Sequence, residues 1–276
     1  MFNSIIYPDH SLSLNSPACL KNLSLIDLKN DGKIMNIISK QDDNLNEALK
    51  PTEDFPISGD YPSCVFLGTS SSCPSKYRNV SSILVSFHET TSVLLDCGES
   101  TLSQLCYRFP TNADIVISSI KLIFISHIHA DHHLGLISLI KSINRFQEVT
   151  ILAQCEIIDF LSYYHTFVSR INFKSIILNS LTPDFLVPSN NIKITCIPVD
   201  HSIEAYGIRL DHLGKSVVYS GDTAYCLNLV NYGFNLFFYL IKHKFKINEK
   251  NIYKAFSTNF TNKKPLFLRT AYKLNL

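Results

Sequence analysis

A dense group of histidines and one aspartate follows the hydrophobic run KLIFIS at residues 121–126. Within six residues it holds His127, His129, Asp131 and His132. Because side chains alternate along a strand, His127 and His129 would project to the same side of a strand end and reach one metal ion. A helix that begins at the next turn favours the Asp131 carboxylate at its N-terminus and lets His132 face a second ion. Imidazole and carboxylate ligands suit zinc, with cobalt, iron or manganese as alternatives.

Two further candidate ligands each follow a β-rich run. His201 lies in VDHS after IKITCIPV, and Asp222 lies in YSGDT after KSVVYS. Taken alone, Asp222 would more often be the N-cap of a following helix. Together with the first cluster, both residues become candidate ligands. A carboxylate that bridges two ions would hold them roughly 3.5 to 4 Å apart, the spacing at which a shared hydroxide acts as a nucleophile at neutral pH.

The segments that would position these ligands alternate between strand and helix patterns. Short β-rich runs are predicted at residues 64–68, 81–87, 92–96, 121–126, 149–152, 192–199, 206–210 and 215–220. Apolar residues three and four apart predict helices at residues 99–109, 131–146, 155–169 and 224–232. Many strands with several packing helices indicate a layered α/β architecture.

Composition limits the classes of protein that fit. The chain has 276 residues, of which 46% are hydrophobic and 17% charged, so a disordered or disulfide-stapled protein is disfavoured. The apolar runs are much shorter than the roughly 18 to 20 residues of a membrane-spanning helix, and we expect no membrane association. The eight cysteines form no CxxC pair, which disfavours a zinc finger and fits a reducing, intracellular compartment.

Three stretches differ in composition. Residues 1–60 are rich in Asn, Ser, Asp and Leu without sustained periodicity, so we expect a poorly ordered lead-in or linker remnant. Residues 61–233 carry the predicted elements and would form a partial catalytic domain. Residues 234–276 form an atypical basic tail, and residues 231–276 hold nine Lys or Arg and one acid. This tail is either a solvated segment or translated AT-rich non-coding sequence.

Several motifs carry a resemblance to a known family. The HxHxDH string, the later histidine and the GDT string resemble the metallo-β-lactamase fold, an αββα sandwich of hydrolases. More narrowly, YPSCVFLGTSSSCPSKYRNVSS (61–82), LLDCGESTLSQL (94–105), SHIHADHHLGL and VVYSGDT resemble tRNase Z, the ribonuclease that removes 3′ trailers from precursor tRNA. The PSKYRN loop and the DCGE string are specific to that branch, whereas HxHxDH alone would also admit glyoxalases, lactamases and sulfatases.

The resemblance implies a role for each candidate ligand. One zinc ion would be held by His127, His129 and His201, a second by Asp131 and His132, and Asp222 would bridge the two. The implied reaction is hydroxide attack on a phosphodiester, which leaves a 3′-hydroxyl on the tRNA. Asp131 would be both a ligand and the catalytic proton acceptor.

The resemblance also implies a substrate-binding loop from Pro74 to Asn79. In the family this loop is associated with the acceptor end of the tRNA, so Lys76 and Arg78 would meet phosphate groups or base edges. The alternative for these residues is a solvated turn.

The sequence departs from the family pattern in two ways. Ser70 and Ser100 stand where the family usually has glycine, which weakens two turns. The family's His-Glu-Ala-Thr strand end, His-Ser-Thr loop and last metal-binding histidine are not found after GDT. His243 is the only later histidine, and we expect neither a strand before it nor a ligand role for it. We therefore expect a sandwich that is incomplete on its C-terminal side and weak binding at the second metal site.

Only 21 positions separate His201 from Asp222, which leaves no room for the tRNA-gripping arm that short-form enzymes insert there. The chain thus resembles the catalytic C-terminal half of the long form. Precursor tRNA is the expected substrate, with a homodimer or a second polypeptide supplying the arm. Long-form relatives imply the nucleus or the mitochondrion, although the first 20 residues contain no Lys or Arg and predict no targeting signal.

Two other functions stay open at this point. The chain could be a catalytically silent homologue that binds metal or tRNA, which the missing histidine favours. It could also be another hydrolase of the same fold, such as a thioesterase, which the PSKYRN loop disfavours.

Overall fold

The computed structural model describes residues 61–187, 191–224, 226–232 and 238–243, all of which lie in one compact unit, Asp54–Leu276. Only the backbone is described for residues 238–243. Our expectations for residues 1–60 and 244–276 lie outside these described residues.

The first of two sheets supplies most of the candidate ligands. Its order is β1-β2-β3-β4-β5-β6, antiparallel from β1 to β3 and parallel from β3 to β6. Its strands are β1 (Ser63–Gly68), β2 (Ser82–His88), β3 (Thr91–Leu95), β4 (Ile120–Phe124), β5 (Val149–Ala153) and β6 (Phe173–Ile177). The central parallel strands are continuous hydrophobic runs because both of their faces are buried.

The second sheet has five strands in the order β11-β10-β9-β8-β7. Its strands are β7 (Phe185–Val187), β8 (Ile192–Pro198), β9 (Tyr206–His212), β10 (Lys215–Thr223) and β11 (Phe238–His243). The strands from β7 to β10 pair antiparallel, whereas β10 and β11 pair parallel.

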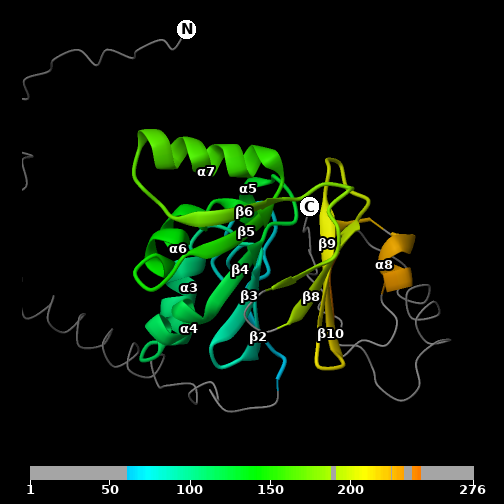
Figure 1. Ribbon diagram of the computed structural model, residues 1–276, viewed down its shortest axis with the longest axis horizontal. Helices are drawn as coiled ribbons and strands as arrows, with labels where there is room; N and C mark the ends of the chain where they lie inside the picture. Colours follow the sequence, from blue (N-terminus) through cyan, green and yellow to red (C-terminus); the bar gives the residue numbers. More distant parts are fainter. Residues whose placement is uncertain (1–60, 188–190, 225, 233–237, 244–276) are drawn as a thin grey trace, which may run out of the picture. The chain divides into compact units, whose positions relative to one another are not determined.

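Helices cover the outer faces of both sheets. The described helices are α3 (Thr101–Arg108), α4 (Ala113–Ser119), α5 (Ala130–His133), α6 (Leu136–Ile143), α7 (Cys155–Phe167) and α8 (Leu227–Tyr232), of which α5 lies at the strand ends. In Figure 1 the two sheets face each other, with α3, α4, α6 and α7 outside the first sheet and α8 outside the second. The predicted αββα sandwich is therefore confirmed.

Two apolar clusters hold the layers together. On β3, Leu94 packs into the cluster between the first sheet and its helices, while Val93 and Leu95 pack into the cluster between the two sheets. All three side chains are fully buried. Burying a side chain of this size contributes roughly 1.5–3 kcal/mol, so the strand that leads to the site lies in a rigid part of the fold.

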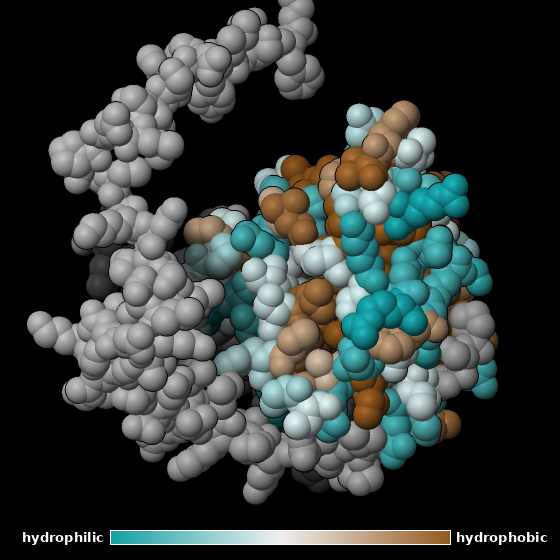
Figure 2. All heavy atoms as spheres, turned by 90° about the vertical axis from the view of Figure 1, so that its left-hand side faces the viewer, coloured by the Kyte–Doolittle hydropathy of each residue, from teal (hydrophilic) through white to brown (hydrophobic). Residues whose placement is uncertain are grey.

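The outer face of the helical layer is mixed in polarity. Figure 2 shows apolar residues gathered at the top of this face, where Figure 1 places α7. Tyr163, Phe167 and Val168 are exposed at the end of α7, with 61%, 70% and 64% of their surface accessible. A small patch of this kind is ordinary on a protein surface.

The eight predicted strands are confirmed, with ends that agree within three residues. The predicted helix over residues 131–146 is instead two helices, α5 and α6, because the chain breaks at Gly135. The Gly135 N–H donates to the Cys97 carbonyl at 2.9 Å, and a Cβ at Gly135 would lie 2.2 Å from the Gly98 carbonyl oxygen. Only glycine permits this close approach.

Four elements were not predicted: α4, β6, β7 and β11. Our expectation that no strand precedes His243 is wrong, because β11 ends at His243 and pairs with β10. The register places Lys242 opposite Asp222 and His243 opposite Thr223. The boundary between the catalytic domain and the basic tail at residue 233 stays a prediction.

Candidate metal centre

The candidate ligands converge from both sheets. His127 and His129 follow the end of β4, and Asp131 and His132 lie in α5. His201 belongs to the loop between β8 and β9, and Asp222 lies near the end of β10. Residues that are far apart in the sequence thus lie close together, at a place where strands of both sheets end.

Three imidazoles form the first group of ligand atoms. Nε2 of His127 lies 2.8 Å from Nδ1 of His129, and Nε2 of His201 lies 3.2 Å from the same Nδ1. All three ligand atoms fall within 4.8 Å of one another, the separation expected of atoms that share a metal ion. His127 is buried, whereas His129 and His201 are partly exposed.

A second group joins His127 with His132 and Asp222, whose ligand atoms also lie within 4.8 Å of one another. Nε2 of His132 is 3.6 Å from Oδ1 of Asp222 and 3.5 Å from Oδ2 of Asp131. All four side chains are buried. His127 therefore contributes to both groups, and Asp131 borders the second.

A buried carboxylate, Asp96, supports the second group through a contact with His132. The sequence analysis did not identify this residue. Oδ2 of Asp96 lies 2.5 Å from Nδ1 of His132 and accepts the Tyr219 hydroxyl at 2.5 Å. This contact fixes the ring of His132 so that Nε2 faces the other ligands, the usual role of a carboxylate behind a metal-binding histidine. The available signal was the position of Asp96 directly after a strand, within the DCGE string.

Ser126 connects the two sheets next to the ligands. Its hydroxyl lies 2.9 Å from Nδ1 of His127 and donates to Asp96 at 3.0 Å. Its carbonyl accepts the Tyr206 N–H at 2.9 Å and the Gln154 side-chain N–H at 3.1 Å. The start of β9 and the end of β5 are thereby tied to the residue that precedes His127.

Burial controls the charge of the centre. Burial and the neighbouring His132 lower the pKa of His127 to about 2, although Asp96 and Asp222 oppose this shift. His127 is therefore neutral at physiological pH and has a lone pair for a metal ion. Burial opposes ionisation of Asp96, but His132, His127 and the Tyr219 hydroxyl together lower its pKa. Burial and the charge of Asp96 raise the pKa of Tyr219 well above its usual value, so Tyr219 stays a hydrogen-bond donor.

A local irregularity directs Asp222 into the centre. Gly221 has φ of 59°, and the pairing of β10 with β11 shifts register between Tyr219 and Asp222. A Cβ at Gly221 would lie 2.8 Å from Cβ of Ser126, so only glycine lets the two sheets approach here. Asp222 is not a helix N-cap, because the next helix begins at Leu227.

The chemistry of this donor set fits metal ions. Neutral imidazoles and buried carboxylates converge within ligand distance, and a carboxylate supports one of the imidazoles from behind. Such sites bind zinc and neighbouring transition metals. The structure brings together the six residues predicted as ligands.

The predicted substrate-binding loop lies beside this centre. Its Pro74, Lys76 and Arg78 are exposed, and the Asn79 side chain donates to the Glu99 carbonyl at 2.7 Å. Two residues before the loop, the N–H of Ser72 donates to Oδ2 of Asp131 at 2.7 Å. The backbone just before the loop thus orients a candidate ligand, while the side chains of Lys76 and Arg78 are exposed to solvent.

The two serines that replace family glycines behave differently. Ser100 adopts φ of 62°, the left-handed region that favours glycine, and it precedes α3. Ser70 has no positive φ, and its hydroxyl instead donates to the Cys73 carbonyl at 2.9 Å. Of these two serines, only Ser100 therefore has the expected backbone strain.

Comparison with known families explains this arrangement. Residues 91–238 match the family described as "Beta-lactamase superfamily domain". The chain belongs to this superfamily. The matched segment spans β3 to the start of β11 and contains every predicted metal ligand, and the fold carries two metal-ligand groups at the strand ends.

Relatives narrow the resemblance to tRNase Z. "Zinc phosphodiesterase ELAC protein 2" of Rattus norvegicus is 37% identical over 199 residues, which is 63% of this chain and 24% of the relative. "tRNase Z TRZ3, mitochondrial" of Arabidopsis thaliana is 56% identical over 73 residues, 26% of this chain and 8% of that protein. The resemblance to tRNase Z drawn from the motifs is confirmed. The chain spans about a quarter or less of the length of these relatives.

A solved structure supports the fold alone. The long-form RNase Z from yeast superposes with a TM-score of 0.55 at 21% identity and covers 71% of this chain and 34% of that one. Among the described helices of this chain, none combines the length and hydropathy of a membrane span.

Proposed function

We propose that the protein is a zinc-dependent endoribonuclease that removes the 3′ trailer from precursor tRNA. The main support for the proposal is the hydrogen bond from Ser72 to Asp131. Because Ser72 lies two residues before the cationic loop from Pro74 to Asn79, this bond holds the loop next to the two groups of metal ligands. A site with this loop beside it suits a phosphodiester flanked by tRNA phosphates.

The residues of the centre have distinct parts in the reaction. His127, His129 and His201 would hold one zinc ion, Asp131 and His132 would hold the other, and Asp222 would contribute to both. Zinc bound here would supply Lewis-acid activation of water and of the phosphodiester. Asp131 would accept the proton of the attacking water, and its hydrogen bond from Ser72 keeps the carboxylate in place.

The loop would orient the substrate. Lys76 and Arg78 are exposed cations within a tight turn, in which the Ser75 N–H donates to the Arg78 carbonyl at 2.9 Å. Asn79 is anchored to Glu99 and therefore fixes the end of the turn. A fixed turn presents its cations to a phosphate at little entropic cost.

The partners and the compartment follow from the relatives. The chain would bind precursor tRNA, either as a homodimer or with a polypeptide that supplies the tRNA-gripping arm. The names of two relatives include the word mitochondrial, which supports a mitochondrial location for this chain. The nucleus is the alternative.

Cleavage of a 3′-extended precursor tRNA tests the proposal. The purified 276-residue chain with zinc or manganese should cut directly after the discriminator nucleotide, and the product should carry a 3′-hydroxyl. The control is Asp131→Asn, which keeps the size of the side chain and should abolish the cut. A wild-type cut elsewhere, or an equal cut by Asp131→Asn, would reject the proposal.

A silent homologue is the second candidate, favoured by the absence of the family's last histidine motif after GDT. It predicts that the wild-type chain takes up zinc and binds precursor tRNA in a gel-shift assay but leaves the tRNA intact. Cleavage at the expected position excludes this candidate.

A further inference from the structure

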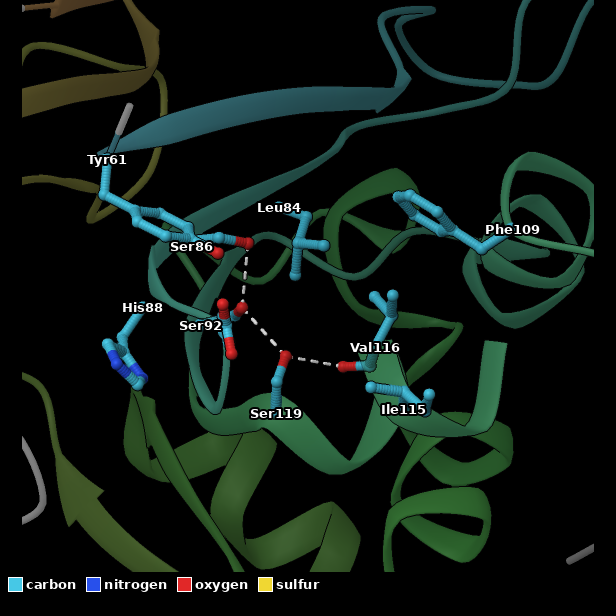
Figure 3. Close-up of a pocket in the computed structure, with 10 residues that line it drawn as sticks. Tyr61, Leu84, Ser86, His88, Ser92, Phe109, Ile115, Val116 and Ser119 are labelled. Carbon is cyan, nitrogen blue, oxygen red and sulfur yellow. Dashed lines mark hydrogen bonds between the residues drawn. The ribbon is translucent and has the colours of Figure 1, made fainter. Parts of the chain in front are cut away.

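A pocket lies at the opposite end of the first sheet from the metal centre. It opens where β2 ends at His88 and β3 begins at Thr91, whereas Asp96 and His127 follow the other ends of β3 and β4. Figure 3 shows its lining, with Phe109 and Val116 on one side, Tyr61 and His88 on the other, and three serines between them. Its empty space is about 360 Å³, including the part open to solvent.

The three serines form a chain of hydroxyl groups whose direction is fixed. Ser119 donates its proton to the Val116 carbonyl at 2.7 Å, and a carbonyl can only accept. The 2.8 Å contact between Ser92 and Ser119 must therefore use the proton of Ser92. By the same reasoning, the 2.9 Å contact between Ser86 and Ser92 uses the proton of Ser86.

This direction determines what the pocket can bind. Each hydroxyl has one proton, and all three protons point away from the open end of the chain at Ser86. Ser86 Oγ therefore offers only lone pairs to a ligand. It makes no other hydrogen bond with the described part of the protein, so it is an acceptor for a ligand N–H group.

The rim supplies a negative charge and two aromatic rings. Glu89 is exposed at the rim, and the rings of Tyr61 and His88 stack with centroids 6.3 Å apart. Burial and the Glu89 carboxylate raise the pKa of Tyr61, which places the carboxylate close to this phenol. A carboxylate beside aromatic faces attracts a cation.

The opposite wall is apolar. Leu84 and Phe109 are buried, Val116 is partly buried and Ile115 is half exposed. The ammonium of Lys215 lies nearby but donates to the Tyr61 carbonyl and is not part of the lining. The pocket therefore has an apolar wall, a hydrogen-bond acceptor at Ser86 Oγ and the Glu89 carboxylate at its rim.

We propose that this pocket binds a small alkylammonium ion. The ammonium group would donate to Ser86 Oγ and to the Glu89 carboxylate, and its alkyl chain would lie against Leu84, Phe109 and Val116. A carboxylate or phosphate ligand is disfavoured, because none of the three serine protons is available and Glu89 repels an anion.

A titration followed by NMR tests the proposal on the full chain loaded with zinc. The probes are n-butylammonium, n-butanol and butyrate, which share one alkyl chain. Butylammonium should shift the backbone amide signals of Ser86 and Ser92 in a saturable way and bind more tightly than either other probe. Glu89→Gln should weaken it roughly tenfold, since the ammonium would then meet a neutral amide oxygen in place of a carboxylate. The matched control is Glu156→Gln, an exposed acid on α7 outside the pocket.

A second variant tests the direction of the hydroxyl chain. In Ser119→Ala, Ser92 loses the acceptor of its proton, so the chain can reverse and turn the Ser86 proton into the pocket. Butylammonium should then bind more weakly and butyrate relatively better than in the wild type. Ser118→Ala is the control, because the Ser118 hydroxyl donates to the Ile115 carbonyl outside this chain.

Three results would overturn the proposal. The first is that no probe shifts the signals of Ser86 and Ser92. The second is that butyrate binds the wild type as well as butylammonium does. The third is that Ser119→Ala leaves the preference between the two probes unchanged.

Discussion

The two groups of metal ligands share His127 but are held in place differently. In the first group, His129 and His201 are partly exposed, and His201 belongs to a loop. In the second, His132 and Asp222 are buried, and Asp96 holds His132 from behind. The first group thus lies partly at the surface, whereas the second is buried.

This difference predicts how each group responds to change. The first has three imidazoles and depends on the correct placement of the His201 loop. That loop is anchored through Asp200, whose carbonyl accepts the Ala224 N–H at 2.6 Å. The second is buried, and the sequence predicts that it lacks the family's last histidine, so we expect it to bind its ion more weakly. A buried group and a group that depends on a loop histidine should differ in affinity and in sensitivity to mutation.

Removal of the shared ligand should have the largest effect. His127→Ala should lower zinc affinity at the first position by more than about 100-fold and weaken the second, because a direct ligand contributes more than a supporting residue. Zinc content after dialysis, measured by atomic emission, checks this. The control is His165→Ala, since His165 hydrogen bonds the Ile171 carbonyl away from the centre. Full zinc retention in His127→Ala would show that His127 is not a ligand.

His201→Ala should abolish zinc binding at the first group of ligands and leave the second group intact. The chain should lose one zinc equivalent and keep the other, because His201 belongs to the first group of ligand atoms and not to the group of His132 and Asp222. The same dialysis measurement, with circular dichroism to verify folding, distinguishes loss of one ion from loss of both. Loss of both would mean that the groups are not independently supported.

Asp96→Asn should weaken the second position by roughly 10- to 100-fold, the usual effect of losing a carboxylate behind a metal-binding histidine. Competition with a chromophoric chelator measures this affinity. Asp114→Asn is the matched control, because Asp114 is exposed and pairs with Arg145 on the surface. An unchanged affinity in Asp96→Asn would contradict the supporting role of this carboxylate.

The metal-free protein should lose stability in acid. The pKa of His127 is about 2 in the folded state, whereas an unfolded histidine titrates near 6.5. Because the unfolded chain binds the extra proton, the contribution of His127 is complete above pH 6.5 and falls as pH decreases toward 2. Its loss by pH 5 should be about 2 kcal/mol. Urea unfolding at pH 7 and pH 5 measures this loss, which should disappear in His127→Gln.

Ser100→Gly should give the smallest effect, a gain of about 0.5–1 kcal/mol, because glycine removes the left-handed strain before α3. Thermal unfolding measures the gain, with Ser70→Gly as the control that should not stabilise. An equal gain at Ser70 would show that φ is not the cause.

The sequence indicated which residues converge better than it indicated the residues that support them. His127, His129, His201 and Asp222 could be found because each follows a hydrophobic strand and has a metal-binding side chain. Asp96 was not recognised, because a single aspartate after a strand does not reveal that Tyr219 and His132 will surround it. That environment arises only when strands from both sheets pack together.

The missed elements also have physical reasons. The strand β6 reads FKSII and is largely exposed, so its hydrophobic pattern is weak. The strand β11 lies in a segment of unusual composition and is defined by its pairing with β10. The break at Gly135 depends on the approach of Gly98, which is a tertiary contact that periodicity does not contain.

Calorimetric titration of the metal-free chain with zinc tests the central claim most directly, which is that the centre contains two separately supported metal positions. The account predicts two binding steps of unequal affinity, with the stronger lost in His201→Ala and the weaker reduced in Asp96→Asn. A single step in the wild type, or loss of the same step in both variants, would contradict it.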